Sequence, residues 1–149
     1  MNDAIGTAPK MTSGPPVLTR EQAAQLAERY LAAYNNRDLE AMLAVQDENV
    51  VSYPTRLGGA KPHRGHDGVR AWWREMAAGD RWYQVLIEEI RHLAPNRVAV
   101  LGEIYDQGEQ ISPWCVVIGI RNGLIVESHS YLSESKLLEQ LGVIPSSDA

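Results

Sequence analysis

The feature that most constrains the fold is a run of four segments, rich in β-branched and aromatic residues, that fills the second half of the chain. Such residues favour strands over helices. Turn signals separate the segments, and Asn122-Gly123 is the strongest short-range indicator of a hairpin. The segments cover residues 82–92, 97–107, 111–121 and 124–132. We therefore predict four strands that form an antiparallel meander.

A helix is predicted ahead of these strands. Thr19 and Gln22 match a capping box, in which two side chains satisfy free backbone amides at a helix start. The helix should run from residue 20 to Asn35, where Asn35-Asn36 breaks it. Apolar and aromatic residues at helical spacing place Tyr30 and Tyr34 on its inward face.

Two further helices and one strand complete the pattern. Asp38 can cap a short helix over residues 39–45, and residues 49–55 are rich in strand formers. A helix over residues 69–77 carries both Trp72 and Trp73 on its core-facing side. The order helix, helix, strand, helix and four strands predicts an α+β fold. In this fold a cone-shaped, curved antiparallel sheet packs on an N-terminal helix layer, as in a cystatin-like α+β roll.

The length of 149 residues fits a single domain. Residues 1–18 mix Gly, Pro, Ser and Thr without periodicity, so we expect a disordered leader there. The domain should occupy residues 19–145, ending in a short helix that Ser133 can cap, and residues 146–149 should form a tail.

Composition restricts the class of protein. The single cysteine allows no intramolecular disulfide, and no secretion signal begins the chain, so we expect a cytoplasmic protein. No apolar run approaches the roughly 20 residues that span a bilayer, which argues against a membrane protein. The net charge of −5 and the scattered basic residues argue against nucleic acid as a partner.

Four stretches in this order resemble the nuclear transport factor two-like superfamily, in its SnoaL-like and ketosteroid isomerase-like branch. They are RYLAAYNNRDLEAM (29–42), NVVSYP (49–54), RGHDGVRAWW (64–73) and NGLIVESHSYLS (122–133). The resemblance covers roughly residues 19–141. It implies the cone-shaped fold with one buried small-molecule pocket, but this fold carries many unrelated activities.

The resemblance also implies roles for individual positions. Tyr30 occupies the place of the tyrosine that hydrogen-bonds the substrate oxyanion in ketosteroid isomerase. Tyr53 and Cys115 stand where that enzyme has its two catalytic acids, and the Asp-Arg-Asp set of limonene epoxide hydrolase is replaced as well. The pocket is therefore expected without either familiar set of acids.

If the register of the family holds, Glu103 and Tyr105 point into the pocket, together with Cys115 and Val117 and with Ser128 and Ser130. Apolar surroundings would disfavour the charged form of Glu103, as a general acid or base requires. We predict Glu103 as the catalytic acid or base, with Tyr30 and Tyr105 as hydrogen-bond donors. The predicted substrate contacts are Tyr34, Tyr53, Trp72, Trp73, Met76, Cys115, Val117, Ser128, His129 and Ser130.

Histidines raise two alternatives. His63 and His66 lie three residues apart, but no further ligands accompany them, so we expect neither a metal nor another cofactor. His129 falls on the face opposite the serines by strand alternation, and a β-bulge would be needed to turn it into the pocket.

The leading hypothesis is a cofactor-independent enzyme that acts on a hydrophobic, oxygen-bearing small molecule by acid/base chemistry, as an isomerase, dehydratase, cyclase or epoxide hydrolase. The alternative is a non-catalytic protein that binds or senses such a molecule. A third possibility is an interaction domain that uses the outer face of the sheet, where Trp114, Val116 and Ile118 are expected. Homodimerisation is the simplest use of that face.

Overall fold

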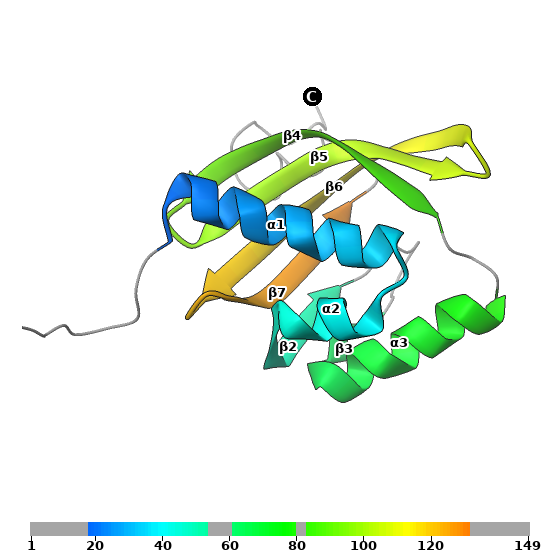
Figure 1. Ribbon diagram of the computed structural model, residues 1–149, viewed down its shortest axis with the longest axis horizontal. Helices are drawn as coiled ribbons and strands as arrows, with labels where there is room; N and C mark the ends of the chain where they lie inside the picture. The colour runs from blue at the N-terminus through cyan, green and yellow to red at the C-terminus, as the bar shows by residue number, and fades with distance from the viewer. Residues whose placement is uncertain (1–17, 54–60, 80–82, 132–149) are drawn as a thin grey trace, which may run out of the picture.

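The computed structural model describes residues 18–53, 61–79 and 83–131, which form three helices and a six-stranded sheet (Figure 1). The helices are α1 (Arg20–Asn35), α2 (Leu39–Ala44) and α3 (Gly65–Gly79). The strands are β2 (Gln46–Tyr53), β3 (His63–Arg64), β4 (Gln84–Ala94), β5 (Arg97–Asp106), β6 (Glu109–Arg121) and β7 (Leu124–Tyr131). The predicted leader, tail and C-terminal helix lie outside the described residues, apart from Leu18.

Both predicted helix starts are confirmed by their caps. The Gln22 backbone N–H donates to the Thr19 hydroxyl at 3.0 Å, and the Thr19 N–H donates to the Gln22 side chain at 2.9 Å. At α2, the Ala41 N–H donates to the Asp38 carboxylate at 3.1 Å. Each cap satisfies donors that a helix start leaves free, which stabilises the helix by about 1 kcal/mol.

Asn35 ties the end of α1 to the start of β4. Its side-chain amide donates to the Val85 carbonyl at 2.8 Å, and its side-chain carbonyl accepts from the Val85 N–H at 2.9 Å. The Asn35 side chain thus makes the two hydrogen bonds with Val85 that the backbone of a neighbouring strand would make. The sequence indicated only a helix breaker at this position.

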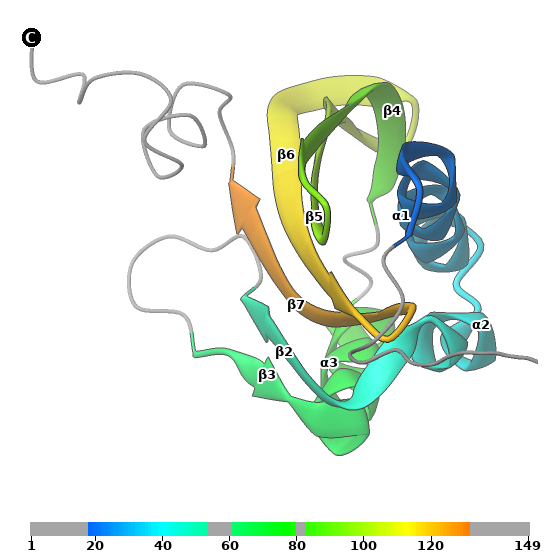
Figure 2. The same ribbon diagram turned by 90° about the vertical axis from the view of Figure 1, so that its left-hand side faces the viewer.

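The strands lie in the order β3-β2-β7-β6-β5-β4. The predicted meander of β4 to β7 is antiparallel throughout, while β2 joins β7 in parallel and β3 is added to β2 as a two-residue edge strand. Figure 2 shows the sheet bent around α1, with α3 packed behind its β2 and β3 end in this view. The predicted α+β class, a curved sheet on a helix layer, is confirmed. No helix in the described ranges is long and apolar enough to cross a membrane.

The core lies between the helices and the inner face of the sheet. From β6 this face contributes Trp114, Val116 and Ile118, which are 8% exposed or less. We expected these three side chains on the outer face, so that prediction is wrong. The outer face instead carries a smaller cluster of Ala99, Leu101, Cys115 and Val117. The homodimer stays a prediction, but its interface cannot be formed by Trp114, Val116 and Ile118.

Candidate functional site

A row of polar side chains crosses the inner face at one end of the sheet. Ser52 on β2 pairs with His63 on β3 and with Ser128 on β7, and Ser128 pairs with Ile118 of the core. Directly paired residues point to the same side of a sheet, so His63, Ser52 and Ser128 all face the helices. We call these three residues the polar row. Ser52 and Ser128 are buried, at 5% and 2% exposed.

Two tyrosines of α1 lie over the polar row. The hydroxyl of Tyr30 is hydrogen-bonded to that of Ser128, and burial raises the pKa of Tyr30 despite this bond. Burial also raises the pKa of Tyr34, whose phenol is close enough to Tyr30 to add to the shift, while a hydrogen bond with the Tyr83 backbone lowers it. Both phenols are therefore kept as neutral hydrogen-bonding groups at physiological pH.

Aromatic residues of α3 form the adjoining wall. The Trp72 ring stacks on Tyr34, with centroids 6.4 Å apart, and on His63 at 5.6 Å. Trp73 meets Trp72 edge to face at 6.2 Å, and Met76 packs against the same core. These aromatic contacts thus join α1, α3 and β3.

Gly68 allows α3 to approach the polar row this closely. A Cβ atom placed there would lie 3.1 Å from the backbone carbon of His63. Backbone atoms cannot move aside as a flexible side chain can, so glycine is the residue that fits this contact. His66 adds a second link, since its Nε2 lies 3.0 Å from the Gln46 carbonyl oxygen.

The hydroxyl oxygen of Ser52 is buried, yet it has no hydrogen-bond partner among the described residues. The side-chain amide of Gln46, earlier on β2, is likewise buried without a hydrogen-bond partner among the described residues. A buried polar group without a partner costs about 1–3 kcal/mol, so such groups usually hold a water molecule or a ligand. The polar row can therefore hydrogen-bond an oxygen of a guest molecule. No group of three potential metal ligands occurs in the described ranges.

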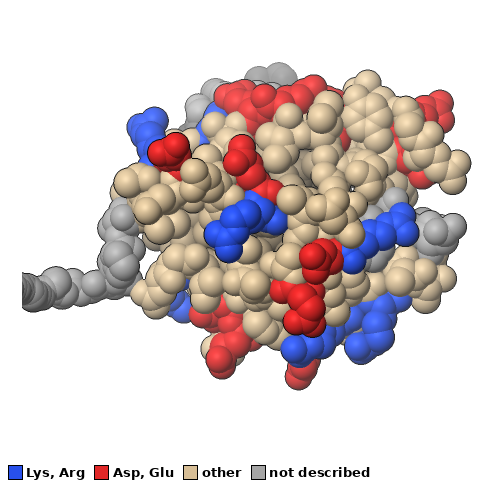
Figure 3. Space-filling view, in the orientation of Figure 1, with Lys and Arg blue, Asp and Glu red and all other residues tan. Residues whose placement is uncertain are grey.

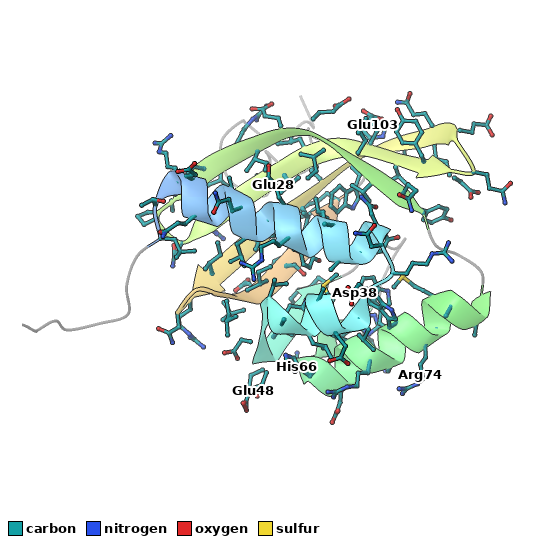
Figure 4. The ribbon with its side chains drawn as sticks, viewed as in Figure 1. Glu28, Asp38, Glu48, His66, Arg74 and Glu103 are labelled. Carbon is teal, nitrogen blue, oxygen red and sulfur yellow. The ribbon has the colours of Figure 1, made fainter. Side chains whose placement is uncertain are left out.

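Glu103 does not belong to this site. It pairs with Pro113 and shares a face with Leu101 of the outer cluster, and its carboxylate accepts a hydrogen bond from the Gln110 side chain. Figure 4 shows Glu103 on the outer side of the sheet, away from α3. Tyr105 follows Glu103 by two residues on the same side. The prediction that both point inward is wrong, because β5 is one residue out of the expected register.

β6 is also one residue out of the expected register, whereas β7 has the register that we predicted. Cys115 and Val117 lie in the outer cluster, contrary to prediction. On β7, Ser128 faces inward as predicted, and so does Ser130, which pairs with Val116 of the core. His129 faces outward, as strand alternation predicted.

His129 has its own contacts on the outer face. Its Nε2 lies 2.9 Å from the Glu127 carboxylate, and its ring stacks on Tyr53 with centroids 4.3 Å apart. Tyr53 is therefore also outside the inner site. Of the predicted site residues, the structure brings together on the inner side Tyr30, Tyr34, Trp72, Trp73, Met76, Ser128 and Ser130.

Two members of the polar row were missed by sequence reasoning. Ser52 could have been found, because alternation with the apolar Val50 places it on the inner face. His63 was considered only as a metal ligand. It lies in a two-residue strand next to prolines and glycines, which gives no periodic signal.

Charged side chains of both signs are interspersed over α1, α2 and α3, while acidic side chains gather along the upper edge of the view, where β4 lies (Figure 3). Among the described residues, no Asp or Glu is buried. The inner site is thus polar through hydroxyl, imidazole and indole groups rather than through carboxylates.

A bent sheet with helices on its concave side and aromatic and hydroxyl groups between them defines a class of small α+β domains. The family model of the SnoaL-like domain matches residues 27–128, and the chain belongs to this family. No protein with a curated description matches the chain.

Solved structures show the same fold at low sequence identity. Bal32a, from a soil-derived mobile gene cassette, is 20% identical with a TM-score of 0.64, over 76% of this chain and 91% of its own. A candidate polyketide cyclase from Xanthomonas campestris pv. campestris is 21% identical with a TM-score of 0.60, over 82% and 98%. A protein of unknown function with a cystatin-like fold from Methylobium petroleophilum is 19% identical with a TM-score of 0.66, over 80% of each chain.

Proposed function

We propose that this chain binds a hydrophobic small molecule bearing a carbonyl or hydroxyl oxygen between the polar row and α3. The observation that carries this proposal is the buried Ser52 hydroxyl, which has no hydrogen-bond partner among the described residues. A ligand oxygen at this point would satisfy it. The aromatic wall of Trp72, Trp73 and Tyr34 would cover the apolar part of the ligand.

We further propose that the bound molecule undergoes cofactor-independent proton transfer, with His63 as the acid or base. Histidine is the side chain whose ordinary pKa lies nearest to neutrality. The ring of His63 is held in place by stacking on Trp72, and it faces Ser52 across the sheet. Tyr30, kept neutral by burial, supplies a hydroxyl that can hydrogen-bond a developing oxyanion. His63 takes the role that we first assigned to Glu103.

A non-catalytic binding or sensing protein is the second candidate. It is favoured by the lack of any buried carboxylate in the described ranges, because both enzymes considered above depend on such groups. One protein of the same fold is a candidate polyketide cyclase, so polyketides are included among the ligands to be tested for either role.

A ligand screen followed by product analysis tests both candidates. The purified chain is heated with steroids, terpenoids and aromatic polyketides, and each compound that raises the midpoint of unfolding is incubated with protein and examined by mass spectrometry. Ser52→Ala should weaken binding of the hits about ten-fold, as expected for one lost hydrogen bond in a buried site. Ser112→Ala is the matched control, since the Ser112 hydroxyl donates to the Pro113 carbonyl outside the site.

His63→Gln separates the enzyme from the binding protein. For an enzyme it should abolish product formation while ligand-induced stabilisation persists. His92 lies on the inner face at the other end of the sheet, so His92→Gln is a matched control that should retain turnover. If the parent chain and the Ser52→Ala variant bind the hits with equal affinity, the proposed site is refuted.

A further inference from the structure

A cleft lies on the outer face of the sheet, where Gly119 has no side chain to fill the surface. Gly119 pairs with Arg97 on β5 and with Glu127 on β7, while Val117 and Arg121 precede and follow it by two residues on β6. All four neighbours therefore stand around the same depression. Its volume is about 190 Å³, and His129 closes the side nearest to Tyr53. We call it the Gly119 cleft.

The cleft is lined by two arginines, Arg97 and Arg121, and by one acidic residue, Glu127. Arg97 and Arg121 are exposed, and neither guanidinium forms an ion pair with a carboxylate of the described residues. Glu127 is the acidic group of the cleft, and its carboxylate already contacts His129 at 2.9 Å. Two positive groups with planar hydrogen-bond donors therefore remain available at the rim.

Part of the cleft lining is apolar. Val117, which is 5% exposed, supplies an apolar side chain, and Gly119 beside it contributes only backbone. Ordinary ligand pockets measure about 300–1,000 Å³, so this cleft suits a smaller molecule with a flat apolar part. A polyanion such as nucleic acid is disfavoured, because two arginines stand against a net charge of −5 on the chain.

We propose that the Gly119 cleft binds a small aromatic or short-chain carboxylate. The carboxylate pairs with Arg97 and Arg121, and the apolar part of the ligand lies on Val117 and the Gly119 backbone. Arginine is suited to this role, because its guanidinium can meet both oxygens of a carboxylate in one plane. This site lies on the opposite face of the sheet from the polar row, so it is independent of the proposed function.

Titration with benzoate tests the proposal. Binding is followed by NMR chemical shifts of the full chain, and benzamide serves as the neutral molecule of the same shape. We expect benzoate to bind at least ten times more tightly than benzamide, and Arg97→Gln and Arg121→Gln each to weaken benzoate binding about ten-fold, as for the loss of a charge-assisted hydrogen bond. Arg74→Gln, an exposed change on α3, is the control and should leave the affinity unchanged.

Two further variants locate the bound benzoate. Gly119→Leu should abolish binding, because a side chain there fills the cleft; a Cβ atom alone would lie 3.0 Å from Glu127 Cγ. Ser52→Ala should leave benzoate binding unchanged. Equal binding of benzoate and benzamide, or loss of binding in Ser52→Ala but in neither arginine variant, would overturn the proposal.

A second copy of the chain is the competing occupant of this cleft, and sedimentation of the same samples detects it. We expect benzoate to bind at concentrations where the chain is monomeric. A dimer that Gly119→Leu dissociates, combined with no benzoate binding, would assign the cleft to self-association and overturn the carboxylate site.

Discussion

The hydroxyl groups of Tyr30 on α1 and Ser128 on β7 are hydrogen-bonded to each other in the interior of the domain. The bond links α1, the longest described helix, to β7, the strand that carries the Ser128 end of the polar row. It therefore fixes the distance between the helix layer and the sheet at the position where a ligand would lie.

A double-mutant cycle should detect this link. Tyr30→Phe and Ser128→Ala should each lower the free energy of unfolding by about 0.5–1.5 kcal/mol, because each leaves a buried hydroxyl unpaired. The double variant should lose less than the sum, since it removes both partners at once. Urea unfolding curves of the four chains give the coupling energy. Additive losses would show that the two hydroxyls do not interact.

Alkaline pH should destabilise the domain through the same residues. Burial raises the pKa of Tyr30 and Tyr34 above the ordinary value of 10.0, so both phenols keep their protons in the folded chain when the unfolded chain has begun to release them. Stability is fully present below pH 10 and is lost as the pH rises from there. Urea unfolding at intervals from pH 8 to pH 11 measures the slope.

The slope assigns the effect to particular residues. Replacing Tyr30 by Phe removes one of the ionising groups, so the loss of stability per pH unit above pH 10 should be smaller in Tyr30→Phe than in the parent chain. An identical slope would mean that Tyr30 ionises equally easily in the folded and unfolded chains.

The helices and most strand limits could be predicted because their signals are local. The capping box at Thr19 and the cap at Asp38 involve side chains three residues from the amides that they bind, and both predictions are confirmed. The Asn122-Gly123 turn joins β6 and β7 as predicted, with Asn122 at a φ of 55° and Gly123 at 76°. Such geometry favours these two residue types wherever it occurs.

The register of β5 and β6 could not be predicted, because these strands are apolar on both faces. Residues from Val98 to Leu101 and from Trp114 to Ile118 are all buried, so alternation of polar and apolar residues does not mark the inner face. A slip of one residue then exchanges the two faces completely. This single error placed Glu103 in the pocket and Trp114 outside it.

The polar row depends on pairings between distant parts of the chain. Ser52 meets Ser128 only because β2 joins β7 in parallel, and it meets His63 only through a two-residue edge strand. A parallel pair needs a long connection and leaves no short-range sequence signal. The site was thus partly predicted through Tyr30, Tyr34 and Ser128, whose own elements have strong local patterns.

The contact between Asn35 and β4 should be worth more than a surface position suggests. Asn35→Ala removes both hydrogen bonds to the Val85 backbone and should lower the free energy of unfolding by about 1–3 kcal/mol. Asn35→Asp keeps the acceptor but sets a carboxylate oxygen against the Val85 carbonyl oxygen, so at neutral pH it should destabilise the domain at least as much as Asn35→Ala. Asn36→Ala, at an exposed neighbour, is the control and should change stability by less than about 0.5 kcal/mol. Equal stability of Asn35→Ala and Asn36→Ala would show that the two hydrogen bonds between Asn35 and Val85 do not stabilise the fold.

The Ser52 hydroxyl should oppose folding in the free chain and favour ligand binding. In the ligand-free chain Ser52→Ala removes a buried group that has no partner among the described residues, so stability should stay unchanged or rise by up to about 1 kcal/mol. Once a ligand oxygen accepts or donates a hydrogen bond there, the same change should weaken binding. Opposite signs for the two effects would be the mark of a binding residue, whereas a purely structural serine would lose stability in both states.

Ser128→Ala is the comparison that makes this test decisive. Ser128 is equally buried and lies in the same row, but its hydroxyl already has Tyr30 as a partner, so its removal should destabilise the free chain. Thermal unfolding of the parent, Ser52→Ala and Ser128→Ala chains, with and without the best ligand from the screen, gives both effects in one experiment. If Ser52→Ala destabilised the free chain as much as Ser128→Ala, the Ser52 hydroxyl would have to be satisfied within the protein, and the main argument for a ligand at the polar row would be lost.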